Sequence, residues 1–218
     1  MKFHRFYTFQ FQLLFYISMS QVSKTQFLVG RSELDLQDDF YPDDLPSEWR
    51  FDYYSTMFKA LSLPIDSDDD LDQIFEEMEE SEEEFELVLS IDKSQLNDSD
   101  ILLSFIEPVS DYKDYFTLYC EIDEPPSTEI MDILSDYNLC FQSLKSLDIK
   151  LKEVFVIDQY IYFNHVPVFY SSVIWDEKKI RSCLEQISVI KTKTVLICKQ
   201  AESETLNRIR IISELLGF

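Results

Sequence analysis

The chain has 218 residues, of which 45% are hydrophobic, including 18 Phe and 12 Tyr. This length and this apolar content fit one folded domain with a sizeable core and exclude a disordered protein. The 42 acidic and 19 basic residues give a formal charge of −23. Such a charge disfavours nucleic acid and anionic membranes as partners, because both are negatively charged.

The first 25 residues differ in pattern from the rest of the chain. Basic residues precede an apolar stretch, as in a signal peptide, but Gln10 and Gln12 interrupt that stretch and no small-residue cleavage site follows. The stretch is also too short to span a bilayer. We expect translation to begin at Met19, with a targeting segment as the alternative. The folded domain is expected to cover residues 26–218 of a cytoplasmic protein.

From residue 26 onward, short apolar runs rich in strand-forming residues alternate with longer amphipathic stretches. This alternation is typical of βα units around a parallel sheet. The sequence predicts seven strands, at residues 26–30, 60–65, 85–91, 115–121, 139–142, 154–163 and 194–199. Only Gly30 and Gly217 are glycines, so neither a phosphate-binding loop nor a dinucleotide fingerprint is present and no cofactor is expected.

Helix boundaries are marked by proline and glycine. Pro46 precedes one predicted helix and Pro125-Pro126 precede another, at positions where a first turn tolerates proline. Leu206 and Ile209 lie at helical spacing in the last predicted helix, which Gly217 should end.

Residues 66–86 form the most acidic segment of the chain. Its apolar residues fall at helical spacing, at Leu71, Ile74, Phe75 and Met78. The pattern predicts a surface helix with one apolar face toward the core and solvated acids on the other. A face that binds a cation or a partner protein is the alternative.

The four cysteines show neither CxxC spacing nor the density of a small secreted scaffold. They are Cys120, Cys140, Cys183 and Cys198. Three of them lie in or beside predicted strands, where a thiol behaves as a small hydrophobic group. We expect reduced, structural cysteines.

The order of several short motifs resembles the YecE-like family. The N-terminal signature is carried by Phe27-Leu28-Val29-Gly30, Phe40-Tyr41-Pro42, Leu45-Pro46, Glu48-Trp49, Tyr53-Tyr54 and Phe58. Three later stretches are similar to family motifs in the same order, at Phe116 to Asp123, Tyr160 to Ser172 and Lys193 to Gly217. The resemblance implies a TIM-type (β/α) barrel of unassigned biochemical function. The shortness of the chain after the third strand predicts a divergent, incomplete barrel of seven strands.

The chain departs from the family's motifs mainly at the carboxyl ends of strands. Arg31-Ser32-Glu33-Leu34 and Leu61-Ser62-Leu63-Pro64 replace its polar strand ends, and Asp123 stands where an ExR motif has arginine. In the RFHG motif the Arg, His and Gly align with Tyr162, Asn164 and His165. Glu121 alone is retained among these polar residues. Barrel enzymes keep their chemistry at these ends, so the departures indicate a lost ancestral site.

Four residues are candidates for a rebuilt site. Glu121 and Asp123 alternate along one predicted strand and could act as paired carboxylates, or they could simply decorate an exposed turn. Asn164 and His165 follow another strand, although a lone histidine cannot form a zinc site and a structural place before Pro167 is the simpler interpretation.

Two functions remain open from the sequence. The favoured one is a non-catalytic binding or structural protein with a protein partner, whose barrel mouth is filled by side chains such as Tyr162 and Phe163. The alternative is an enzyme, metal-assisted or not, that uses Glu121, Asp123, Asn164 and His165 in one deep pocket.

Overall fold

Nine strands form one mixed sheet in the order β6-β7-β5-β4-β3-β2-β1-β9-β8. The computed structural model describes residues 26–36, 40–67, 70–151, 153–157, 159–164, 168–171, 176–190 and 193–217. The strands are β1 (Phe27–Ser32), β2 (Ala60–Pro64), β3 (Glu86–Ser90), β4 (Phe116–Glu121), β5 (Asn138–Ser143), β6 (Glu153–Ile157), β7 (Tyr160–Asn164), β8 (Val168–Ser171) and β9 (Thr194–Cys198).

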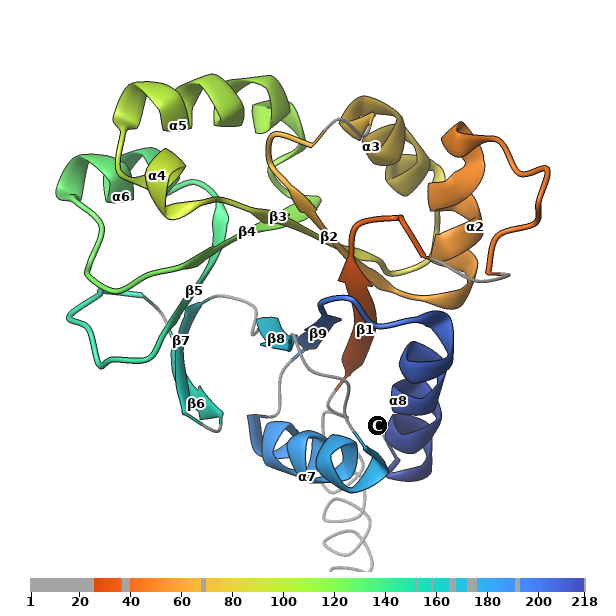
Figure 1. The fold of residues 1–218 in the computed structure, drawn as a ribbon. Coiled ribbons are helices and arrows are strands. Elements are labelled where there is room, and N and C mark those ends of the chain that lie inside the picture. The colour runs from red at the N-terminus through yellow and green to blue at the C-terminus, as the bar shows by residue number, and fades with distance from the viewer. Residues whose placement is uncertain are drawn as a thin grey trace, which may run out of the picture.

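The sheet is a half-barrel, which corrects the prediction of a seven-stranded TIM-type barrel. All neighbouring pairs from β8 through β9, β1, β2, β3 and β4 to β5 are parallel, but β7 runs antiparallel to both β5 and β6. The edge strands are β6 and β8, which do not pair with each other in the described part of the chain. Figure 1 shows the sheet curving around a concave face that stays open between these edges.

Two local features account for the wrong strand number. The single strand predicted at 154–163 is an antiparallel hairpin, with Ile157 opposite Tyr160 across the connection. The two connecting residues are Asp158 and Gln159 instead of the Asn-Gly or Asp-Gly pair that usually announces such a turn. Strand β8 was not predicted, because it is only four residues long and follows directly after Pro167.

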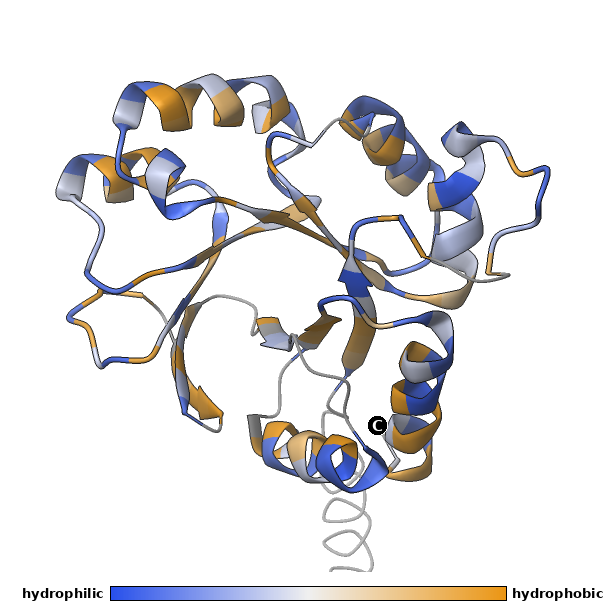
Figure 2. Ribbon diagram, in the orientation of Figure 1, coloured by the Kyte–Doolittle hydropathy of each residue, from blue (hydrophilic) through white to orange (hydrophobic). Residues whose placement is uncertain are grey.

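Helices lie on the convex side of the sheet (Figure 1). They are α2 (Arg50–Met57), α3 (Leu71–Glu80), α4 (Lys93–Leu96), α5 (Ser99–Ile106), α6 (Thr128–Leu134), α7 (Glu177–Ile187) and α8 (Ser203–Leu215), with 3-10 turns at Ser47–Trp49, Glu107–Tyr112 and Ser188–Ile190. Figure 2 shows hydrophobic residues along the central strands and mixed faces on the helices, as expected for helices that cover a sheet. None of the described helices combines the length and the apolar character needed to cross a bilayer.

The predicted acidic helix is confirmed as α3. Asp70 caps its first turn by accepting a hydrogen bond from the backbone N–H of Gln73 at 3.2 Å. Ile74 and Phe75 are buried, and the ring of Phe75 stacks on Tyr112 with centroids 4.4 Å apart. The acids of this helix therefore need no ligand to explain the fold, since the apolar face alone anchors the helix.

Strand β6 presents an exposed apolar edge. Val154 and Val156 alternate with buried or half-buried residues along it and are 54% and 68% exposed. The helix α7 contacts this strand, but no other described strand pairs with its outer edge.

At the amino ends of the strands a buried acid is neutralised by a lysine. Glu86 is 8% exposed, and its carboxylate accepts a hydrogen bond from the Thr117 hydroxyl at 2.6 Å and an ion pair from Lys193 at 2.8 Å. Lys193 also contacts Glu84 at 3.0 Å. Burial by itself lowers the pKa of Lys193, but the two carboxylates outweigh it and the net shift is upward.

Replacing Lys193 with methionine is expected to lower the free energy of unfolding by about 2 kcal/mol. The variant leaves the Glu86 carboxylate buried without its cation, and the loss stays below that of a fully buried pair because Lys193 is partly exposed. Urea denaturation at neutral pH measures it. Lys178→Met, at an exposed position of α7, is the matched control. Equal stabilities of the two variants would refute the structural role of the pair.

Candidate functional site

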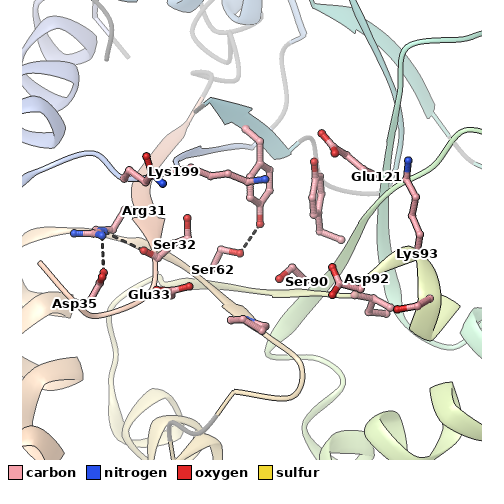
Figure 3. Close-up of a pocket in the computed structure, with 16 residues that line it drawn as sticks. Arg31, Ser32, Glu33, Asp35, Ser62, Ser90, Asp92, Lys93, Glu121 and Lys199 are labelled. Carbon is pink, nitrogen blue, oxygen red and sulfur yellow. Dashed lines mark hydrogen bonds and ion pairs between the residues drawn. The ribbon is translucent and has the colours of Figure 1, made fainter. Parts of the chain in front are cut away.

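A pocket of about 670 Å³ opens at the carboxyl ends of the parallel strands (Figure 3). Its lining comes from the ends of β1, β2, β3, β4 and β8 and from the segments that follow β1, β3 and β9. The charged members of the lining are Arg31, Glu33, Asp35, Asp92, Lys93, Glu121 and Lys199. Ligands of open α/β sheets bind at this end of the strands, so the location alone makes the pocket a candidate site.

Two of the three basic residues are already paired with carboxylates. Figure 3 shows the Arg31 guanidinium turned toward Asp35, to which its Nη2 lies 2.6 Å away, and its Nε donates to the backbone oxygen of Ser32 at 3.0 Å. Lys93 forms an ion pair with Asp123 at the rim. These two ion pairs connect the segments around the pocket, and Nη1 of Arg31 is buried without a hydrogen-bond partner in the described structure.

The third basic residue, Lys199, has no ion-pair partner among the described residues. Its ammonium group lies over the ring of Tyr170, 5.0 Å from the centroid. Contact with the face of an aromatic ring stabilises a cation without neutralising its charge. Lys199 is thus a positioned positive charge at the pocket wall.

On the β4 side of the pocket, Glu121 is held by a chain of hydrogen bonds. The buried Gln142 donates from Nε2 to the Glu121 carboxylate at 3.1 Å. The Tyr119 hydroxyl in turn donates to Oε1 of Gln142 at 3.0 Å, which fixes the orientation of the amide. Burial raises the pKa of Tyr119 well above its usual range, so this hydroxyl stays a donor.

Two stacked tyrosines form the floor between Lys199 and Glu121. The rings of Tyr119 and Tyr170 lie 3.9 Å apart between centroids, at 20° to each other. The Tyr170 hydroxyl is hydrogen-bonded to the hydroxyl of Ser62 on β2, and its pKa is raised by burial. Strands β2, β4 and β8 are thereby joined across the concave face, and the floor of the pocket is rigid.

Unusual backbone conformations occur at the same place. Glu33 has φ 64° and Gln200 has φ 57°, and these are the non-glycine residues with positive φ in the described chain. Both line the pocket, one after β1 and one after β9. The backbone N–H of Glu33 donates to Ser62 O at 2.8 Å. Such strained conformations collect at functional sites, where the surrounding structure maintains them.

The structure brings one of the four candidate residues into the pocket. Glu121 lines it. Asp123 lies beyond the end of β4, its side chain is 61% exposed, and it pairs with Lys93 at the rim. Asn164 pairs with Cys140, two residues before the Gln142 that neighbours Glu121, so its backbone lies away from the carboxyl end of the sheet. His165 lies outside the described residues.

The pocket is not filled in the way that the sequence suggested. Tyr162 is buried and lies opposite Gln142 in the strand register, so its side chain is on the concave face of the sheet, as that of Gln142 is. Phe163, the next residue along the strand, points to the opposite face. Neither of them lines the polar pocket. The described residues contain no group of three or more His, Cys, Asp or Glu side chains that could hold a metal ion.

Sequence reasoning missed most of the residues that build the site. Lys199 ends the predicted strand 194–199 and Gln142 ends the predicted strand 139–142, and a polar residue at the carboxyl end of a strand was a usable signal. The contacts of Gln142, Tyr119 and Tyr170 could not be predicted, because they depend on the register between β4 and β5 and on the unpredicted β8.

Comparisons of this chain with family models, with curated proteins and with solved structures found no match. The resemblance to the YecE-like family therefore stays a prediction, and the functional argument rests on the pocket alone.

Proposed function

We propose that this protein binds a small polar molecule in the pocket formed by the carboxyl ends of the parallel strands. The observation that carries the proposal is the convergence of Lys199 and Glu121 on one pocket, two charges of opposite sign, neither of which forms a salt bridge with a described side chain. Glu121 is exposed and Lys199 is half-buried, so both charges are open to a ligand that enters the pocket. Their fixed positions above a stacked tyrosine floor suit recognition of a specific molecule.

Binding is favoured over catalysis by what surrounds Glu121. Among the described side chains, Gln142 is the one hydrogen-bonded to its carboxylate, and an amide does not exchange protons at neutral pH. Catalysis by a paired acid and base, or by an activated nucleophile, needs a second titratable group within hydrogen-bonding reach of the first. Asp123 is occupied by Lys93 at the rim.

We also propose a cytoplasmic location. The four cysteines are buried and form no disulfide, a pattern typical of proteins of a reducing compartment.

A thermal-shift screen tests the proposed binding. The probes are sugars, nucleosides, standard amino acids and small carboxylic acids. A probe at about 100 times its dissociation constant stabilises the native state by about 2.7 kcal/mol, which raises Tm by about 5 to 10 °C in a chain of this size. Lys199→Met and Glu121→Gln are each expected to reduce the shift to about half or less, because binding about tenfold weaker lowers the stabilisation by that much.

Matched controls are Lys178→Met on α7 and Glu129→Gln on α6, both at exposed positions outside the pocket. They should keep the full shift. A flat response to every class of probe, or a shift that both pocket variants keep in full, would reject the proposed function.

A further inference from the structure

The free charges of the pocket define a ligand class. Of the seven charged lining residues, Arg31 and Lys93 are paired with Asp35 and Asp123, and Lys199 is the basic residue of the lining that has no ion-pair partner among the described residues. Glu121 accepts one hydrogen bond and faces no cation within ion-pair distance among the described residues. The pocket therefore offers one anchor for an anionic group and one for a cationic group.

The overall electrostatics disfavour a ligand with one sign of charge. An anion would approach a chain of charge −23 and meet Glu33, Asp92 and Glu121 in the lining. A simple cation could pair with those acids, but it would displace water from Lys199 without offering that residue an anion. A molecule that carries both charges avoids both costs.

The arrangement of the two anchors also favours such a molecule. Lys199 follows the end of β9 and lies over Tyr170, whereas Glu121 ends β4 and accepts a hydrogen bond from Gln142. Figure 3 shows Lys199 and Glu121 on the wall of the pocket. The stacked pair of Tyr119 and Tyr170 lies between them. Because both charged groups are held in place before binding, a ligand with matching groups loses little free energy to reorganisation of the site.

We infer that the pocket binds a zwitterion of the amino-acid class, with its carboxylate on Lys199 and its ammonium group on Glu121. This inference rests on the proposed function and adds the class of ligand to it. The side chain of the ligand then faces the serine and glutamine groups of the lining, which include Ser32, Ser94 and Gln200. These groups fit a polar side chain better than an aliphatic one.

The test is isothermal titration of the wild-type chain with the standard amino acids, followed by two analogues of the strongest binder. If that binder is glutamine, the analogues are glutaramate, which lacks the ammonium group, and 4-aminobutanamide, which lacks the carboxylate. Each analogue is expected to bind about tenfold to hundredfold more weakly, because a charged hydrogen bond is lost.

The pocket variants sharpen the assignment. In Lys199→Met, glutamine and 4-aminobutanamide should bind equally, because the carboxylate has lost its anchor. In Glu121→Gln, glutamine and glutaramate should bind equally. The Tm and the circular dichroism of the unliganded variants check that both fold, and Lys178→Met should behave as wild type.

The outcomes separate the inference from the proposed function. If no amino acid binds while a sugar or nucleoside binds in a manner that depends on Lys199 or Glu121, the zwitterion assignment is wrong and the binding function stands. If analogues bind as tightly as the amino acid, the assignment is likewise wrong. If no probe of any class binds, both are wrong.

Discussion

Replacing Gly30 with alanine is expected to lower the free energy of unfolding by about 3 kcal/mol or more. A Cβ atom at this position would lie 1.5 Å from the backbone oxygen of Ala60 and 2.9 Å from the Tyr54 hydroxyl. That hydroxyl joins the two neighbouring strands: it accepts from the Arg31 N–H at 3.1 Å and donates to Ala60 O at 2.7 Å. The methyl group would separate β1 from β2 and break both hydrogen bonds.

The control for this prediction is Gly217→Ala. Gly217 has φ +88°, but no atom lies within 4 Å of the position that the alanine methyl group would take, so this change adds backbone strain without a collision. Its cost should be about 1 kcal/mol. Urea denaturation compares the two variants with wild type. A Gly30→Ala variant as stable as Gly217→Ala would show that β1 and β2 are not in close contact.

The free energy of unfolding is expected to fall as the pH rises above about 9. Burial raises the pKa of Tyr54, Tyr119 and Tyr170 above the usual 10.0, and raises the pKa of Cys120 and Cys198 from 9.0 to about 12. Above pH 9 the unfolded chain releases these protons whereas the folded chain keeps them, so unfolding becomes easier as pH rises.

Each such group lowers the free energy of unfolding by about 1.4 kcal/mol per pH unit between its unfolded and its folded pKa. Lys193 acts in the same direction, because its raised pKa gives stability that is present below its unfolded pKa and is lost as pH rises through the folded value. Urea denaturation from neutral pH to about pH 11 measures the slope. In Cys198→Ala the slope should be smaller by the contribution of one titrating group. A free energy of unfolding that stays constant over this range would contradict the burial of these side chains.

The parallel strands could be predicted from local sequence patterns, whereas the antiparallel end of the sheet could not. Strands β2, β3, β4 and β9 lie where short apolar runs predicted them, because such a run depends only on neighbouring residues. The hairpin of β6 and β7 has the same composition as one long strand, and only pairing partners distinguish them. The change from a barrel to a half-barrel follows from that hairpin, since an antiparallel strand beside β5 interrupts the parallel order before β8 and β9.

The residues of the candidate site also differ in how well the sequence predicts them. Glu121 was identified because an acid at the end of a predicted strand is a local signal. Gln142 was not, since its role comes from standing beside Glu121 in the register of β4 and β5. Asp123 was overvalued, because the sequence does not show that Lys93, thirty positions earlier, lies against it.

The exposed edge of β6 gives the large negative charge of the chain a second significance. A strand whose outer edge pairs with no described strand, and whose Val154 and Val156 are exposed, is a template on which another copy of the chain could add its own strand. Two copies that approach one another each carry a charge of −23, and their mutual repulsion opposes that encounter at low ionic strength. The acidic residues of α3 and its neighbours thus help to keep copies of the protein from associating through the open edge of the sheet.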